Sequence, residues 1–187
     1  CTVEVQVYNH FLKSKCKPFL GVIHRLDRVT SGVLIFSKKK RVLVEFNELF
    51  SKRKVQKTYY AIVKKKPRKN KETLINFLVK NTLKKRADIV SSKSKDALEC
   101  ILCYELIGKN DLGYLLAIKP KTGRFHQIRA QLAHIGLPII GDKKYGSDQV
   151  YLPLSICLHA RELSYQKFGS NEVKTFKAPL PKNDFWT

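Results

Sequence analysis

The chain has 187 residues, 43% of which are hydrophobic, a length that supports one sizeable core and is short for two independent ones. Lysine and arginine number 37 against 15 aspartates and glutamates, so the formal net charge is +22. A fold gains nothing from that much self-repulsion, so the charge indicates a polyanionic partner. Nucleic acid is favoured over a membrane because no apolar run approaches the ~20 residues of a spanning helix, and no signal-peptide pattern is present, so we expect a cytoplasmic protein.

The cysteines are odd in number and scattered, which argues against a secreted disulfide framework; they are Cys1, Cys16, Cys100, Cys103 and Cys157. Cys100 and Cys103 have the spacing of zinc ligands, but no second pair complements them and they lie in an apolar run typical of a strand. We therefore interpret them as structural thiols. The sequence begins at Cys1 and contains no Met, so we expect residues 1–187 to form a single domain that is truncated at its N-terminus.

The first third of the chain contains two helix-like and several strand-like segments. Residues Val3–Phe11 are compatible with a short helix. Residues 21–38, GVIHRLDRVTSGVLIFSK, place a polar stretch between two apolar ones, which is typical of strand, exposed loop, strand. Apolar residues then recur at helical spacing, which predicts an amphipathic helix over Lys39–Arg53. Val55–Val63 predicts a strand, and it leads into KKKPRKNK at residues 64–71, where six of the eight residues are basic.

The rest of the chain returns repeatedly to strand patterns. The expected strands are Thr73–Lys80, Leu98–Ile107, Tyr114–Lys119, Ile156–Leu163 and Glu172–Lys177. The second and third of these would pair across a turn at residues 108–113. A helix of about three turns is predicted from Gly123, with Phe125 and Ile128 on its apolar face, and Gly136 ends it. Many strands interrupted by a few helices predict an α+β domain with a mainly antiparallel sheet and flanking helices.

The first candidate for chemistry is Asp27, the carboxylate of the polar loop HRLDRVTSG at residues 24–32. His24, Arg25 and Arg28 surround it in sequence. Nearby cations keep a carboxylate ionised, which makes it available as a nucleophile or as a stabiliser of developing positive charge. The same spacing fits a loop aspartate paired with a surface arginine, so the residues alone leave both interpretations open.

The second candidate is the segment KTGRFHQIRAQLAHIG at residues 121–136, in which Arg124, His126, Arg129 and His134 accompany a helix start. Backbone N–H groups at such a start could hold a phosphate. We interpret His126 as a structural histidine rather than as a catalytic base. Because no second His or Cys lies at a metal-ligand spacing, we expect no metal site.

Several blocks of sequence closely resemble the signature motifs of the RluA-type pseudouridine synthases. They are HRLD followed by TSG at residues 24–32, and TGRFHQIR at residues 122–129. GDKKYG at residues 141–146 resembles a third block of the family, and KTYYA at residues 57–61 is similar to the strand that carries its active-site tyrosine. The blocks follow the family's order and together span about two thirds of the chain. The Lys-Pro-x-Gly segment and the S4-type RNA-binding module of many members are not seen in the sequence.

The resemblance implies the pseudouridine synthase catalytic fold and the isomerisation of uridine to pseudouridine, a reaction that needs no cofactor. It implies that Asp27 is the nucleophile, that Tyr59 stacks near the target base and that Arg129 forms an ion pair with Asp27. Tyr60 would point to the opposite face of the strand. The resemblance also implies that Arg25 fills the space left by the extracted uridine. Attack at C1′ and removal of the C2′ proton to give a glycal both remain open.

We expect structured RNA as the partner, with ribosomal RNA favoured over transfer RNA, and a monomeric enzyme. The residues expected to contact RNA are basic; they are Arg25, Arg28, Lys64, Lys65, Lys66, Arg68, Lys69 and Arg124. The triplet Lys84–Arg86 is a further candidate for phosphate contact. One alternative is a non-catalytic RNA-binding or ribosome-assembly protein with the same fold. Another is a glycosidase or nuclease with paired carboxylates, although the block around Asp27 contains no second acidic residue.

Overall fold

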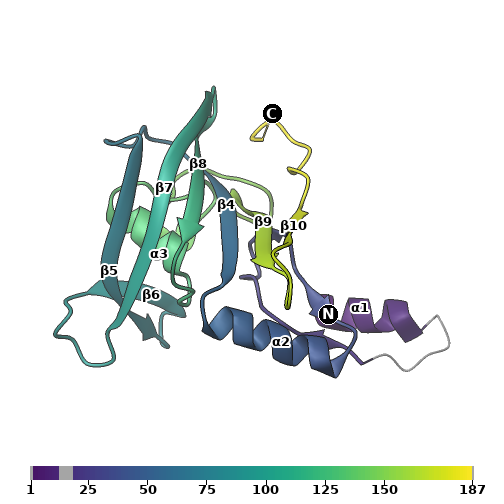
Figure 1. The fold of residues 1–187 in the computed structure, drawn as a ribbon. Helices are drawn as coiled ribbons and strands as arrows, with labels where there is room; N and C mark the ends of the chain where they lie inside the picture. The colour runs from purple at the N-terminus through teal and green to yellow at the C-terminus, as the bar shows by residue number, and fades with distance from the viewer. Residues whose placement is uncertain (1, 13–18, 187) are drawn as a thin grey trace. The chain divides into compact units, whose positions relative to one another are not determined.

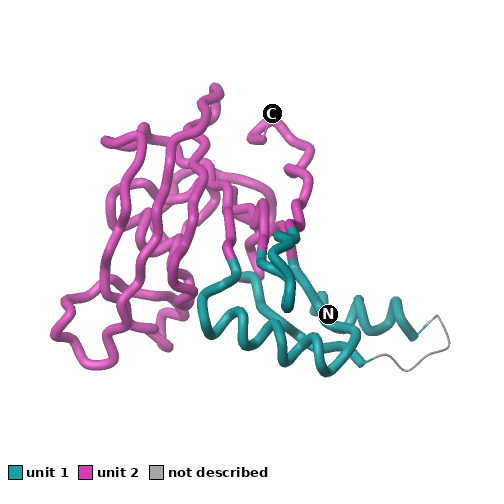
Figure 2. Tube along the Cα trace, in the orientation of Figure 1, with its two compact units in different colours: residues 1–26, 34–55, 165–174 teal, residues 27–33, 56–164, 175–187 magenta. Residues whose placement is uncertain are grey.

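The structure, a computed structural model, describes residues 2–12 and 19–186. The chain divides into two compact units, which Figure 2 colours separately. Unit 1 contains residues 1–26, 34–55 and 165–174. Unit 2 contains residues 27–33, 56–164 and 175–187. Cys1 and Cys16 lie outside the described residues.

Unit 1 contains the helices of the first part of the chain. Helix α2 (Lys40–Ser51) confirms the helix predicted over Lys39–Arg53, and it buries Phe46 and Leu49 from its apolar face. Strands β1 (Gly21–Val22) and β3 (Phe36–Ser37) pair in antiparallel fashion, so the strands predicted around the polar loop are present but short. Helix α1 (Val3–Leu12) confirms the helix predicted at Val3–Phe11 and buries none of its residues.

The main sheet has the strand order β10-β9-β4-β8-β7-β5-β6, with the short β2 paired to β9 (Figure 1). Its strands are β2 (Ser31–Gly32), β4 (Val55–Val63), β5 (Lys71–Asn81), β6 (Arg86–Val90), β7 (Leu98–Asn110), β8 (Gly113–Pro120), β9 (Leu158–Gln166) and β10 (Val173–Lys177). The central pairs are antiparallel, whereas β2 and β9 run parallel. The predicted α+β class with a mainly antiparallel, mixed sheet is confirmed.

Two details of the sheet differ from the prediction. Strand β6 was not predicted, because the basic residues at its start conceal a short run in which Ala87 is buried. The turn expected at residues 108–113 is shorter, because β7 extends to Asn110 and β8 begins at Gly113. The Asn110 side chain closes this turn by accepting the N–H groups of Leu112 and Gly113, each at 3.0 Å.

Helix α3 (Gln127–His134) is shorter than the predicted three turns from Gly123. It begins late because His126 has a left-handed backbone, with φ at 50° and ψ at 22°, a conformation that no helix continues through. Phe125 therefore lies before the helix and is 36% exposed, so its predicted place on the apolar helix face is wrong. Ile128 is buried as predicted. The helix ends before Gly136, whose φ is +77°.

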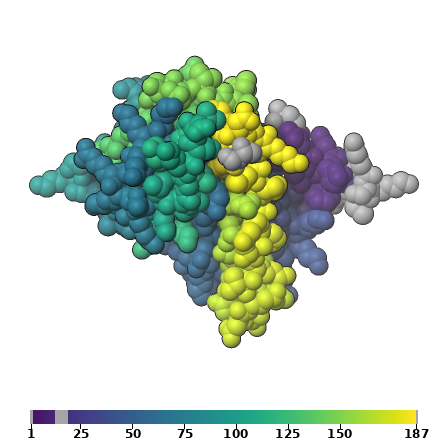
Figure 3. Space-filling view, turned by 90° about the horizontal axis from the view of Figure 1, so that it is seen from above, coloured from purple at the N-terminus to yellow at the C-terminus, as the bar shows by residue number. Residues whose placement is uncertain are grey.

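The core of unit 2 lies where α3 packs against the sheet, and apolar residues of β4, β7, β8 and α3 fill it. Those with at most 1% exposure include Ala61, Ile62, Val63, Leu102, Leu116, Ile118 and Leu132. Figure 3 shows the C-terminal segment, in yellow, beside the teal β7–β8 hairpin, where the Asn110 side chain donates to the Phe185 carbonyl at 3.1 Å. Among the described residues, no helix combines the length and apolar character needed to cross a bilayer.

Candidate active site

The loop that carries Asp27 is fixed at its base by backbone contacts within unit 2. The Thr30 N–H donates to the Asp27 carbonyl at 2.8 Å and closes a turn, and the Val33 N–H donates to the Ala160 carbonyl at 2.8 Å. Between these bonds, β2 pairs with β9. Gly32 has φ at +117°, and a Cβ there would lie 2.6 Å from the Ala160 nitrogen, so only glycine allows this close approach. The pairing of β2 with β9 therefore anchors the end of the loop that carries Asp27.

Arg129 reaches Asp27 from helix α3, although 102 positions separate the two in the sequence. Its Nη1 lies 3.4 Å from Asp27 Oδ2. The Arg129 side chain is 5% exposed and the Asp27 side chain 27% exposed. The structure thus brings together the two residues that the resemblance pairs. A partly exposed carboxylate opposite a buried guanidinium can meet a substrate while its charge stays compensated.

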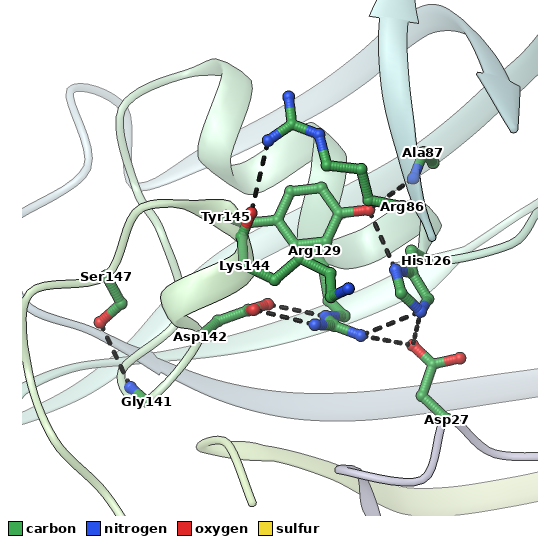
Figure 4. A network of polar contacts seen from close by, with 10 residues as sticks. All are labelled: Asp27, Arg86, Ala87, His126, Arg129, Gly141, Asp142, Lys144, Tyr145 and Ser147. Carbon is green, nitrogen blue, oxygen red and sulfur yellow. Dashed lines mark hydrogen bonds and ion pairs between the residues drawn. The ribbon is translucent and has the colours of Figure 1, made fainter. Parts of the chain in front are cut away.

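Asp142, from the GDKKYG block, holds the other edge of the same guanidinium (Figure 4). Arg129 Nε donates to Asp142 Oδ2 at 2.7 Å and Nη2 donates to Oδ1 at 2.8 Å, which is a bidentate pair. Asp142 is 1% exposed. Burial alone would lower the pKa of Arg129, but the hydrogen bonds and charge of Asp142 and the charge of Asp27 raise it above its ordinary value. The guanidinium is therefore always charged and held in one orientation.

His126 and Tyr145 continue this network beyond Arg129 (Figure 4). Arg129 Nη1 lies 3.1 Å from His126 Nε2, and His126 Nδ1 lies 3.0 Å from the Tyr145 hydroxyl. That hydroxyl also accepts the Ala87 N–H at 2.7 Å. A guanidinium can only donate, so His126 Nε2 accepts and the proton of the neutral ring is assigned to Nδ1, which donates to Tyr145. The Arg129 guanidinium carbon lies 5.0 Å from the centre of the Tyr145 ring.

Burial keeps the His126 imidazole and the Tyr145 phenol uncharged. It lowers the pKa of His126 below its ordinary 6.5; Asp27, whose Oδ2 lies 3.8 Å from Nε2, acts in the opposite direction, and Arg129 lowers the pKa further. Burial also raises the pKa of Tyr145 to about 12. His126 and Tyr145 therefore orient Arg129 without adding charge to the site. The contacts of His126 agree with its interpretation as a structural histidine.

Tyr59 lies on β4 opposite Ile118 of β8 and packs against the core of unit 2. Burial, and then the charge of Asp27, raise the pKa of its phenol to about 12. The phenol therefore stays protonated at neutral pH. The alternation of the strand directs Tyr60 to the other face, where the Arg161 guanidinium lies 6.0 Å from its ring centre. This arrangement supports Tyr59, rather than Tyr60, as the tyrosine of the site.

Lys57 is a site neighbour that the sequence analysis did not identify. Strand alternation places it on the same face of β4 as Tyr59, two residues later. Its Nζ lies 3.5 Å from where a Cβ on Gly123 would stand, so it approaches the segment that leads into α3. Burial lowers the pKa of Lys57. The signal that could have found it is the two-residue period of the strand.

The residues predicted to contact RNA do not all lie near Asp27. Arg28 is exposed in the turn that follows Asp27, and Arg124 is half-buried with its Nε donating to the Glu99 carbonyl at 3.3 Å. Arg25 is exposed and belongs to unit 1, whereas the other predicted site residues belong to unit 2. The loop with Lys64, Lys65, Lys66, Arg68 and Lys69 follows the end of β4. It begins five residues beyond Tyr59, about 17 Å along an extended strand.

The basic triplet Lys84–Arg86 lies beside Tyr145. Lys144 Nζ donates to the Lys84 carbonyl at 3.3 Å, and Arg86 Nη1 donates to the Lys144 carbonyl at 3.4 Å. The Arg86 Nε also donates to Asp88 at 2.5 Å. The turn between β5 and β6 therefore carries positive charge to the edge of the Asp27 site.

The cysteine pair shows no sign of ligand geometry. Cys100 is fully buried on β7 and its thiol donates to the Asn76 carbonyl at 3.2 Å, while Cys103 is partly exposed. Three residues along a strand reverse the direction of a side chain, so the two thiols face opposite sides of the sheet. In residues 2–12 and 19–186 no group of three or more His, Cys, Asp or Glu is placed to hold a metal ion.

The family model for RNA pseudouridylate synthase matches residues 6–134 of the chain. The chain belongs to this family. The chain is 32% identical to the tRNA pseudouridine synthase C of Vibrio parahaemolyticus over 201 residues, which cover 98% of this chain and 80% of the relative. The ribosomal large subunit pseudouridine synthase C of Buchnera aphidicola is 39% identical over 191 residues, which cover 95% of this chain and 59% of the relative.

The solved structures agree on the fold. The structure of human RNA pseudouridylate synthase domain containing 1 matches this chain with a TM-score of 0.81 at 24% identity, over 96% of this chain and 74% of the human one. The predictions of an RluA-type family member, of an RNA pseudouridine synthase enzyme and of the pseudouridine synthase fold are confirmed. The alternative of a hydrolase with paired carboxylates also finds no support in the site, because Asp142 is buried and both of its oxygens contact Arg129.

Proposed function

We propose that the synthase isomerises specific uridines in ribosomal or transfer RNA, with Asp27 as the nucleophile. The observation that supports this role is the contact of Asp27 with Arg129. Because Asp142 takes the short hydrogen bonds of the guanidinium, the contact to Asp27 at 3.4 Å is long, and the carboxylate keeps its capacity to react. A fixed positive charge that needs no reorganisation is the kind of group that stabilises charge in a closed site.

The proposed reaction breaks the N1–C1′ bond of uridine, turns the base and forms a C5–C1′ bond. Asp27 either bonds to C1′ and leaves again or removes the C2′ proton and returns it. The C5 proton is lost to solvent and N1 gains a proton, so product and substrate are isomers and no cofactor is consumed. Tyr59, which is protonated and near enough to Asp27 for that charge to raise its pKa, would stack on the base.

The substrate uridine would have to leave its helix to meet Asp27. Enzymes that act on a base inside a duplex turn it out of the stack at a cost of a few kcal/mol. We assign Arg25 to fill the space that the uridine leaves. Arg28, Arg124 and the basic loop at residues 64–69 would contact phosphates, and a net charge of +22 supports such contacts.

We also propose that both units belong to one catalytic domain, because the family match at residues 6–134 includes parts of each. The relatives that act on tRNA and on the large ribosomal subunit support both RNA classes as substrates. The strong positive charge opposes self-association, which supports a monomer acting on cytoplasmic RNA. Sedimentation of the free enzyme at working concentration tests the monomer.

Tritium release tests the proposed chemistry. Ribosomal and transfer RNA transcripts are labelled at uridine C5 and incubated with wild type or with Asp27→Asn, which keeps the shape of the side chain. We expect wild type to release tritium from ribosomal RNA, transfer RNA or both, and the variant to release none, with equal RNA affinity for the two proteins. Release by Asp27→Asn would exclude Asp27 as nucleophile. Tight binding without release by wild type would instead favour a non-catalytic RNA-binding protein.

A further inference from the structure

Phe125 places an aromatic ring at the surface next to the Asp27 site. It is 36% exposed and lies in the segment between Gly123 and helix α3. Its ring stacks on that of His126, with centroids 3.8 Å apart and planes 20° apart. Both residues precede the helix because His126 has a left-handed backbone, and their rings stack on each other, His126 mostly buried and Phe125 at the surface.

His126 contacts both Asp27 and Phe125. His126 Nε2 lies 3.8 Å from Asp27 Oδ2, and Phe125 lies on the ring of His126. A base that stacked on the free face of Phe125 would therefore lie on the far side of that ring from His126, which is the residue that contacts Asp27. Such a base cannot be the reacting uridine, which must reach the carboxylate, but it can be a neighbour of that uridine in the same strand.

Positive charge surrounds the exposed ring. The Lys80 Nζ lies 5.4 Å from the centre of the Phe125 ring, and Lys80 is exposed at the end of β5. Arg124 precedes Phe125 directly, and the basic turn at residues 84–86 continues from Lys80. An exposed aromatic ring with cations close to it is the combination that binds single-stranded nucleic acid, because bases stack on the ring while phosphates meet the charges.

We propose that Phe125 is a stacking platform for an unpaired RNA base that flanks the target uridine, with Lys80 and Arg124 contacting the adjoining phosphates. The inference rests on the proposed function, because a strand opened to release one uridine leaves its neighbours without a stacking partner. On binding, the Lys80 ammonium moves from the ring to a phosphate and the base takes its place. The platform supplies affinity and register, whereas Asp27 supplies the chemistry.

Two substitutions at Phe125 separate stacking from packing. Phe125→Leu keeps apolar volume against His126 but has no aromatic face, and Phe125→Ala has neither. Both are expected to raise KM for the transcript that releases tritium by about 5- to 150-fold, the range for loss of one base–aromatic stack. Because the stack is made in ground state and transition state alike, kcat stays within about twofold. Phe176→Ala is the control, since Phe176 is 43% exposed on β10, at the other end of the strand order.

A fluorescence titration reports the stack directly. The chain has one tryptophan, Trp186, which is 8% exposed. In Phe125→Trp we expect added transcript to quench the new, exposed tryptophan, while the fluorescence of wild type changes little. Lys80→Gln should weaken binding and reduce the slope of log affinity against log salt by about one.

The outcomes distinguish this proposal from the proposed function. Wild-type KM in both Phe125→Leu and Phe125→Ala, or no quenching in Phe125→Trp, would overturn the platform while tritium release still stood. A fall in kcat for Phe125→Ala that Phe125→Leu restores would assign Phe125 to packing against His126 and would also overturn it. Loss of tritium release in wild type would instead refute the proposed function.

Discussion

Replacing Asp142 with asparagine should destabilise the protein strongly, because the change breaks a buried ion pair. Asparagine keeps the volume of the side chain, but it removes the charge and turns one acceptor toward Arg129 into a donor. Removing one partner of a buried pair costs about 3–5 kcal/mol. Asp27 remains at 3.4 Å as a partial counter-charge, so we expect the lower end, about 3 kcal/mol. For a chain of this size that corresponds to about 6–12 °C in Tm.

Urea unfolding at pH 7, followed by the fluorescence of Trp186, measures the effect. Glu162→Gln is a matched control that also removes one carboxylate from an ion pair. Its partner Lys177 lies 3.2 Å away, and the two side chains are 31% and 60% exposed. Exposed pairs contribute about 0–1 kcal/mol, so the control should lose little. If Asp142→Asn lost no more than Glu162→Gln, the Arg129–Asp142 pair would not have the energetic weight that its burial implies.

Two further predictions concern the tyrosines of the site. Tyr145→Phe leaves the Ala87 N–H and the His126 Nδ1–H without their acceptor, so urea unfolding should show a loss of about 1–3 kcal/mol; wild-type stability would show that these two hydrogen bonds do not stabilise the fold. Tyr59 has a folded pKa of about 12 against an ordinary 10, so above pH 10 the unfolded chain releases a proton that the folded chain keeps, and stability falls as pH rises. In Tyr59→Phe the fall between pH 10 and 11.5 should be shallower by about 1 kcal/mol per pH unit, and an unchanged slope would show that Tyr59 is not protected.

The elements that could be predicted from the sequence are those whose pattern is local. Helix α2 and strand β4 each carry their own period within a few residues, and both were predicted to within two residues of their ends. Strand β6 has only five residues, too few to show a clear alternation of apolar and polar side chains beside the basic triplet Lys84–Arg86. The predicted start of α3 was too early because Phe125 fits helical spacing. No sequence pattern indicates that His126 adopts a left-handed backbone.

The site was predictable in part, and for a different reason. Asp27 and its cationic neighbours stood out locally, but its pairing with Arg129 came from the resemblance and not from any spacing. Asp142 and Tyr145 were noticed only as letters of the GDKKYG block. Their roles depend on contacts with Arg129 and His126, which α3 carries, and no periodicity reports a contact between separate segments.

The close approach at Gly32 has a consequence for reading genetic variation in this chain. A side chain at Gly32 would collide with the backbone of Ala160 and separate β2 from β9, and Asp27 lies five residues earlier in the same loop. A Gly32 variant would thus lose activity without losing any group that touches RNA. In a screen of random variants it would be scored beside Asp27 as though it took part in the chemistry, whereas a lowered melting temperature would distinguish it from Asp27→Asn. The inactive positions found by such a screen would therefore include residues that anchor the Asp27 loop to β9 as well as the reacting groups.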